Sequence, residues 1–213
     1  MKVITIPVTP FMQNCRVIAC DVTGKAAIVD PGGDVEKILS AIEDHKLAVE
    51  FILLTHGHLD HVGASIELAD SLEIEIVGPH IEDKFWLDGL PMQAQMFGFA
   101  PQAGFTPHKW LEEGDVIELG ELKLAVKHCP GHTPGHVVFY EPKSASVLVG
   151  DVLFKGSVGR TDFPKGNAAQ LKHAIETKLF TLDDNTRVMS GHGEDTSIGY
   201  EKRNNPFMSG RFG

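Results

Sequence analysis

Residues 56–61, which read HGHLDH, carry three histidines and one aspartate. A metal can use all four side chains only where the backbone turns sharply. The apolar run Phe51–Leu54 before them has the pattern of a short buried strand, and Val62 onward has that of a helix. The segment is therefore expected at a strand end, where open α/β folds place their ligands. The alternative, a solvated histidine-rich loop, is disfavoured by the apolar flanks and the non-repetitive composition.

The spacing within this segment divides its ligands into two pairs. His56 and His58 lie two residues apart in extended chain, so their side chains project to the same side. Asp60 and His61 leave in a different direction as the helix begins. One loop can thus supply ligands to two adjacent metal positions, and further ligands must come from other parts of the chain.

Three more candidate ligands follow apolar, strand-like runs, and they are His132, Asp151 and His192. The preceding runs are Leu122–Lys127, Val147–Gly150 and Arg187–Ser190, respectively. Prolines and glycines in the segment Cys129–His136 favour a tight loop that can hold His132 outward. Cys129 is an alternative ligand in this loop. A carboxylate at Asp151 can bridge two cations with its two oxygens.

These residues together resemble the metallo-β-lactamase superfamily, whose pattern is matched by His56-x-His58-x-Asp60-His61, His132, Asp151 and His192. The turn Asp30–Gly33 also matches the superfamily. The motifs Gly131–His136 and Gly159–Asp162 narrow the resemblance to the glyoxalase II-like branch, the hydroxyacylglutathione hydrolases. The segment Arg203–Phe207 is similar to that of the short, single-domain bacterial members.

The resemblance implies a dinuclear metal site. One metal would be bound by His56, His58 and His132, the other by Asp60, His61 and His192, with Asp151 and a water-derived hydroxide bridging them. We expect two divalent ions and name zinc first, although iron and manganese also suit imidazole and carboxylate ligands.

The resemblance also implies a reaction, the hydrolysis of S-D-lactoylglutathione to D-lactate and glutathione. Bound metals lower the pKa of water to about 7, so no serine or cysteine nucleophile is needed. Asp60 is the predicted catalytic residue, which would orient the water or accept its proton. A thiolate leaves readily, so a thioester needs little help from a general acid.

Substrate-binding residues are less clearly indicated. Arg160 falls where longer relatives of this branch place a basic glutathione-binding residue, and Lys155 is a second candidate. A pair between Arg160 and Asp162 that merely fixes the loop is the structural alternative. Glu194 stands where those relatives have a tyrosine, so glutathione recognition must differ here. The irregular segment 88–110 is expected either to form a flap beside the cleft or to pack onto the core.

Other functions fit parts of the same pattern. A persulfide dioxygenase of this branch would bind a single iron through His56, His132 and Asp151 alone, leaving positions for oxygen and thiol. Hydrolysis of a lactone, lactam or phosphodiester, and a non-catalytic metal-binding module, are further alternatives. The metal content separates the dioxygenase from the hydrolase.

Composition limits the partners that we expect. The formal net charge is −10 without any cluster of lysine and arginine, which argues against nucleic-acid binding and against docking on an anionic membrane. Neither a signal sequence nor an apolar run of membrane-spanning length is indicated. Cys15 and Cys20 should face opposite sides of a strand. We expect a cytoplasmic enzyme, monomeric or a small homo-oligomer, with a small glutathione thioester as its partner.

The order of predicted elements is mixed α/β. The strand-like runs are Val3–Pro7, Arg16–Cys20, Ala26–Val29, Phe51–Leu54, Ile74–Val77, Leu122–Lys127, Val137–Tyr140, Val147–Val149 and Arg187–Ser190. The helical patterns are Asp34–His45, Val62–Ser71, Pro91–Phe97 and Asn167–Lys178, with Asp34 and Asn167 as N-caps. At 213 residues the chain fits one domain, 1–213. The resemblance implies a four-layer αββα sandwich with the metal site at one edge of the two sheets.

Overall fold

The N-terminal half of the chain builds a five-stranded mixed sheet in the order β1-β2-β3-β4-β5. Its strands are β1 (Lys2–Val8), β2 (Gln13–Ala19), β3 (Lys25–Val29), β4 (Ala48–Leu53) and β5 (Glu75–Val77). The first three strands are antiparallel, whereas β3, β4 and β5 run parallel. The parallel strands therefore end at the same edge of this sheet. The computed structural model describes residues 1–209.

The C-terminal half builds a six-stranded sheet in the order β13-β12-β9-β8-β7-β6. Its strands are β6 (Val116–Leu119), β7 (Leu122–His128), β8 (Val137–Glu141), β9 (Ser146–Gly150), β12 (Arg187–Ser190) and β13 (Thr196–Ser197). A separate short hairpin pairs β10 (Leu153–Phe154) with β11 (Ser157–Val158). Only β9 and β12 are parallel neighbours, so they too end side by side.

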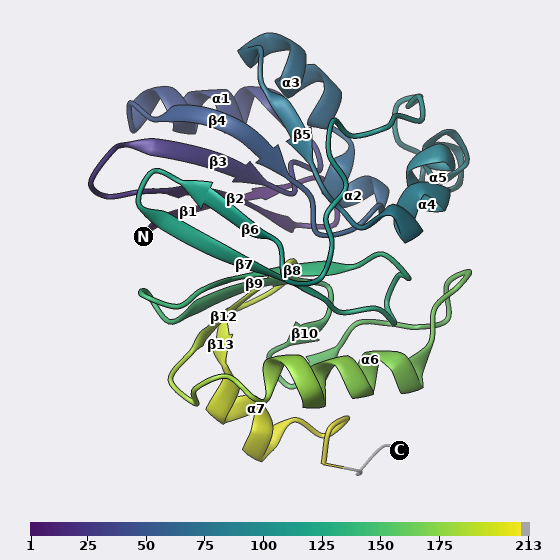
Figure 1. Cartoon of the computed structure of the whole chain (residues 1–213). Coiled ribbons are helices and arrows are strands. Elements are labelled where there is room, and N and C mark those ends of the chain that lie inside the picture. The colour runs from purple at the N-terminus through teal and green to yellow at the C-terminus, as the bar shows by residue number, and fades with distance from the viewer. Residues whose placement is uncertain (210–213) are drawn as a thin grey trace.

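Helices cover the outer faces of the two sheets (Figure 1). The first sheet carries α1 (Val35–Asp44) and α3 (Ser65–Leu72), and the second carries α6 (Ala168–Ala174) and α7 (Ile198–Asn204). A π-helical turn, Ile175–Leu179, extends α6. Three short helices, α2 (Leu59–Val62), α4 (Lys84–Asp88) and α5 (Leu90–Phe97), lie together at one end of the sandwich. The four layers confirm the predicted αββα architecture.

Three apolar clusters fill the spaces between the four layers. Leu53 and Val77 of the first sheet meet Phe139 and Leu148 of the second in the central cluster. The two outer clusters join each sheet to its own helices. Cys15 lies in an outer cluster and Cys20 in the central one, which confirms that they face opposite sides. No helix within residues 1–209 is long and apolar enough to cross a lipid bilayer.

The helix predicted over Val62–Ser71 is wrong in its boundaries and in being continuous. Helix α2 begins earlier, at Leu59, and ends at Val62, and α3 starts only at Ser65. The break occurs because the N–H of Ala64 donates to the carbonyl of Pro31 instead of continuing the helical ladder. Asp60 and His61 therefore lie on a helix of a single turn.

Two further expectations about helices have different outcomes. Asn167 caps α6 as predicted, because its side chain accepts a hydrogen bond from the N–H of Gln170. Asp34 precedes α1 but does not cap it; its backbone is left-handed, and its carboxylate accepts from the N–H of Thr9 and from Lys37.

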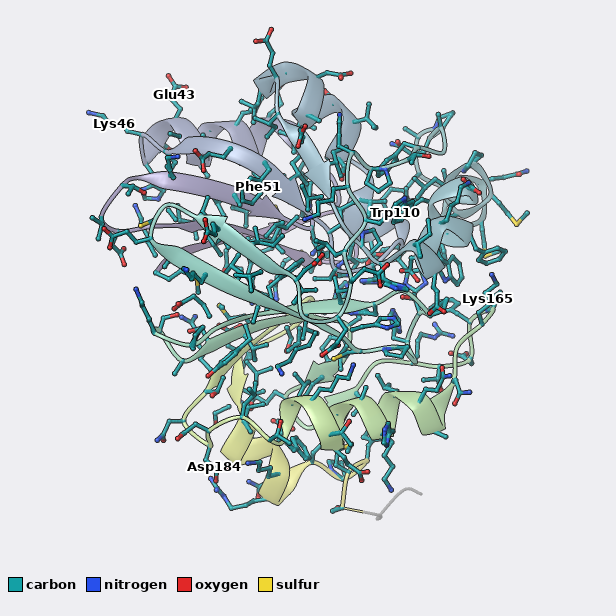
Figure 2. All side chains as sticks on the ribbon, viewed as in Figure 1. Glu43, Lys46, Phe51, Trp110, Lys165 and Asp184 are labelled. Atoms are coloured by element: carbon teal, nitrogen blue, oxygen red, sulfur yellow. The ribbon has the colours of Figure 1, made fainter. Side chains whose placement is uncertain are left out.

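The segment 88–110 both packs onto the core and stands beside the site. Phe99, Phe105 and Trp110 pack against the cluster beneath the first sheet. Met92 and Met96 instead point outward from α5, each with 68% of its surface exposed. Figure 2 shows Trp110 near α4 and α5, on the side where the loop carrying Lys165 projects. The Lys165 ammonium lies 4.3 Å from the centre of the Phe85 ring on α4.

Candidate metal centre

Strand ends bring all seven predicted metal ligands to one edge of the sandwich. The segment that follows β4 carries His56, His58, Asp60 and His61. The β7–β8 loop carries His132, Asp151 follows β9, and His192 follows β12. All seven side chains are buried or half-buried. Side chains separated by more than a hundred residues in the sequence thus share one small volume.

The first group consists of three buried imidazoles. His58 Nδ1 lies 3.1 Å from His56 Nε2 and 3.0 Å from His132 Nε2. A single proton cannot satisfy three nitrogens that face one another, whereas one cation between them can. Burial and the neighbouring imidazoles lower the pKa of both His56 and His58 well below the ordinary value, so both rings are neutral. Neutral imidazole is the form that binds a metal.

The second group consists of Asp60, His61 and His192. Asp60 Oδ2 lies 3.2 Å from His192 Nε2 and 3.9 Å from His61 Nε2. Burial alone would raise the pKa of Asp60, but the charge of His61 and the hydrogen bond with His192 outweigh it and lower the pKa. The carboxylate therefore stays ionised at neutral pH.

Asp151 lies between the two groups. Its Oδ1 is 3.3 Å from His61 Nε2, and its Oδ2 is 3.7 Å from His132 Nε2 and 3.6 Å from His192 Nε2. Burial opposes its ionisation, yet the surrounding imidazoles, His61 first, hold its pKa well below the ordinary range. One carboxylate thus faces ligands of both groups with its two oxygens.

The family model of the metallo-beta-lactamase superfamily matches residues 8–192 of this chain. The chain belongs to the metallo-β-lactamase superfamily. It is 45% identical over 212 residues to hydroxyacylglutathione hydrolase GloC of Haemophilus influenzae, covering 99% of this chain and 100% of that protein. It is also 36% identical over 211 residues to a probable metallo-hydrolase, YqgX, of Bacillus subtilis, with 99% of each chain covered.

Solved structures of the superfamily superpose closely on this chain. BLEG-1, a B3 metallo-β-lactamase, has a TM-score of 0.90 and 36% identity, covering 98% of this chain and 100% of its own. TTHA1623 in a di-iron-bound form has a TM-score of 0.86 and 37% identity, covering 96% of this chain and 99% of its own. The sequence comparison and the structure comparison therefore both show the metallo-β-lactamase fold.

The donor atoms of the site fit a pair of metal ions. His61 Nε2 and Asp151 Oδ1 are buried and make no hydrogen bond within the protein. Orphaned polar atoms at this depth are costly unless a ligand satisfies them. The His/Asp clusters are consistent with a binuclear site. Cys129 lies outside these clusters and is buried among apolar side chains, which raise the pKa of its thiol to about 12. It is therefore not placed to be a ligand.

Two buried residues around the ligands orient them. Asp30 accepts hydrogen bonds from the N–H and hydroxyl of Thr55, and its Oδ2 lies 2.9 Å from His61 Nδ1. His136 stacks on His56 with ring centres 4.6 Å apart, and its Nε2 accepts from the N–H of Asp151.

Asp83 connects the loop after β4 with the β7–β8 loop through hydrogen bonds. Sequence analysis did not identify it as a residue of the site. Its Oδ2 accepts hydrogen bonds of 2.8 Å from the N–H of Gly57 and from the hydroxyl of Thr133, and its Oδ1 accepts one of 2.6 Å from the N–H of Gly135. Gly57 lies between two ligands, and Thr133 follows a third. No spacing in the sequence marks Asp83, because its partners come from remote loops.

A cleft of about 590 Å³ opens beside the ligands. Its lining includes Phe11, Leu59, Trp86, Gln93, Phe97, Phe154, Val158, Arg160 and Phe163, together with His58, Asp60, His132, Asp151 and His192. Such a volume suits a small-molecule ligand with an apolar part. Sequence analysis missed the aromatic residues, because single aromatic side chains in loops carry no periodic signal.

The two predicted substrate-binding residues differ in position. Arg160 lines the cleft, but its guanidinium makes two hydrogen bonds to Asp162 and lies 4.2 Å from the centre of the Phe163 ring. The Arg160–Asp162 pair considered from the sequence is therefore present. Lys155 is not part of the cleft lining among the described residues, and its ammonium pairs with Glu194.

Proposed function

We propose that this protein hydrolyses thioesters of glutathione, with S-D-lactoylglutathione as a substrate. The observation that carries the proposal is the pair of His/Asp clusters joined by Asp151, in a chain 45% identical along its length to a hydroxyacylglutathione hydrolase. An apolar cleft with one arginine at its wall opens onto these clusters.

The proposed ligand assignment follows the two clusters. His56, His58 and His132 would hold one ion, Asp60, His61 and His192 the other, and Asp151 would be shared. Bound there, two divalent ions supply an activated water and polarise the thioester carbonyl. The di-iron-bound structure of TTHA1623 supports a dinuclear site, and zinc or manganese suits the same donors.

Asp60 is the proposed catalytic residue. Its carboxylate is ionised, lies in the cleft lining and faces His192, so it can accept a hydrogen bond from a water between the clusters. The reaction adds the water oxygen to the carbonyl carbon and breaks the carbon–sulfur bond. A proton then passes to the leaving thiolate, which needs little assistance at neutral pH.

Arg160 is the proposed contact for a carboxylate of glutathione. It is the cationic side chain of the cleft lining among the described residues. In the substrate complex the carboxylate would share the guanidinium with Asp162 or replace it. Arginine suits this role because its planar fork binds carboxylates through two hydrogen bonds.

Two assays on the purified, metal-loaded protein test the proposal. We expect S-D-lactoylglutathione to release thiol and D-lactate without oxygen uptake. Oxygen consumption on glutathione persulfide, with one iron per chain, would instead establish the dioxygenase alternative. A β-lactam serves as a control for general hydrolytic activity, since BLEG-1 is named a metallo-β-lactamase.

Asp151→Ala tests the shared carboxylate. We expect kcat/KM to fall by about three orders of magnitude or more, because both ions lose a ligand and the water between them loses its position. Metal content and circular dichroism of the variant are measured alongside. Full turnover with both metals bound would show that Asp151 is not a bridge.

A further inference from the structure

The cleft beside the metal ligands is far larger and more apolar than a lactoyl group needs. Its volume is about 590 Å³, in the range of pockets that bind drug-sized molecules. Five of its lining residues are aromatic: Phe11, Trp86, Phe97, Phe154 and Phe163. With the glutathione moiety lying toward Arg160, a two-carbon hydroxyacyl side chain would leave the aromatic wall on the opposite side exposed to water. The apolar wall therefore indicates which acyl groups the cleft can bind.

The two sides of the cleft differ in chemistry. On the side of His132, the carbonyl of Arg160 lies 2.7 Å from His132 Nδ1, and the Arg160 side chain lies over Phe163. On the side of His192, the carbonyl of Phe11 lies 3.2 Å from His192 Nδ1, and the ring of Phe154 lies 6.3 Å from the His192 ring. The first side thus has a cation beside its aromatic rings, whereas the second has aromatic rings without a cation among the described lining residues.

The apolar side is built by two segments that meet over the cleft. Phe11, in the turn between β1 and β2, contacts Phe97 at the end of α5 edge to face, with ring centres 5.7 Å apart. Phe11 also packs on Phe99, at 5.5 Å. Phe11 remains 45% exposed and Phe97 43% exposed, although both line the cleft. An apolar group lying against them would remove this surface from water.

We propose that the acyl group of the preferred substrate is an unbranched, medium-length apolar chain that lies against Phe11 and Phe97. This inference rests on the proposed thioester hydrolysis. The carbonyl lies at the metal ligands, the glutathione carboxylate extends to Arg160, and the acyl chain extends to the opposite side. The chemistry is unchanged: water cleaves the carbon–sulfur bond and yields a fatty acid and a thiol.

The charges of the lining favour this orientation over the reverse one. Glutathione carries two carboxylates, and the described lining near Phe11 and Phe97 offers them no cation. The Asp60 carboxylate also lies on that side, 3.2 Å from His192 Nε2, and it offers no hydrogen-bond donor to a second carboxylate. An uncharged chain needs no such donor and displaces water from the aromatic rings. The same argument makes Phe11 and Phe97 specificity-determining residues.

The test compares kcat/KM for the S-acetyl, S-butanoyl, S-hexanoyl and S-D-lactoyl thioesters of glutathione on the metal-loaded protein. Each methylene buried against the rings contributes up to about fourfold. We therefore expect S-hexanoylglutathione to exceed S-acetylglutathione by about tenfold or more. A flat or falling profile with chain length would overturn the inference while leaving thioester hydrolysis intact. Hydrolysis of none of these thioesters would overturn both.

Two variants test whether the rings of Phe11 and Phe97 cause the dependence of kcat/KM on acyl-chain length. Phe97→Ala and Phe11→Ala should each lower kcat/KM for the hexanoyl substrate by about tenfold and that for the acetyl substrate by much less. Met92→Ala is the matched control, because it lies on the same helix with 68% of its surface exposed and outside the cleft lining. Met92→Ala should keep the chain-length profile. Equal losses on all substrates in the Phe97 and Phe11 variants would contradict a contact with the chain.

Discussion

At the scale of residues, Arg160 has one observed partner, Asp162, and one proposed partner, a carboxylate of the substrate. Its guanidinium pairs with Asp162 while its side chain lines the cleft, and about 60% of that side chain is exposed. An exposed ion pair contributes little to stability, about 1 kcal/mol or less. The pair can therefore open for a substrate carboxylate at small cost, which reconciles the observed contact with a role in binding.

Arg160→Ala should raise KM for glutathione thioesters by about tenfold, because a charge-assisted hydrogen bond is lost. KM for a thioester of N-acetylcysteamine, which lacks the carboxylates, should stay within about twofold. Asp162→Asn is the control that removes the partner and keeps the arginine. If both variants raised KM equally for both thioesters, Arg160 would be assigned to fixing the loop.

Asp83 links stability to pH. Burial raises the pKa of Asp83 to about 6 from an ordinary value of 3.8, although three donors oppose the shift. The folded state thus binds the proton more tightly than the unfolded state. The stability that this proton contributes is fully present below about pH 4 and is lost as the pH rises through about 6.

Asp83→Asn removes this titration. The cost of the substitution in unfolding free energy should be about 1 kcal/mol larger near about pH 5 than near about pH 8. Denaturant unfolding of both proteins at the two pH values measures the difference. A cost that was the same at both pH values would mean that the pKa of Asp83 in the folded protein is not raised above its ordinary value, and a cost that grew as the pH rose would contradict the sign of the shift.

The clustering of the seven predicted ligands could be foreseen from the sequence, whereas the contacts of Asp83, Phe11 and Phe97 could not. Each ligand follows an apolar run or lies in a loop of prolines and glycines, so local patterns mark it. The role of Asp83 depends on donors from two remote loops, and the contact of Phe11 with Phe97 depends on how a turn and a helix meet. Such tertiary relations leave no local pattern.

At the scale of elements, the strand ends explain why the site lies where it does. Strands β9 and β12 were predictable because their residues are apolar and mostly buried, whereas β6, which alternates between exposed and buried residues, was not predicted. The break between α2 and α3 was not, because the carbonyl of Pro31 takes the N–H of Ala64. The short strands β10, β11 and β13 are only two residues long, below what periodicity can indicate.

Gly191, directly after β12, tests how closely the strand ends pack. A Cβ at this position would collide with the carboxylate of Asp151 and would lie 2.7 Å from Cε1 of His61. Gly191→Ala should therefore displace ligands and weaken metal affinity by about 10- to 100-fold. Metal affinity is measured by competition with a chelator, and circular dichroism checks the fold. Unchanged affinity would mean that the site has room which the structure does not show.

At the scale of the whole molecule, two sheets with separate outer cores meet at a shared central core. Each sheet supplies part of the ligand set, so the site needs both halves. The net charge of −10 opposes anionic substrates at long range, so under the proposed function Arg160 and two bound ions would have to attract them locally. The apolar cleft would then select among thioesters by the acyl group.

The measurement that tests the central claim most directly is hydrolysis of S-D-lactoylglutathione during titration of metal-free protein with zinc, iron or manganese under anaerobic conditions. The two clusters joined by Asp151 predict that activity rises until two ions are bound per chain. Full hydrolytic activity at one ion per chain, without further gain at two, would contradict a dinuclear thioester hydrolase.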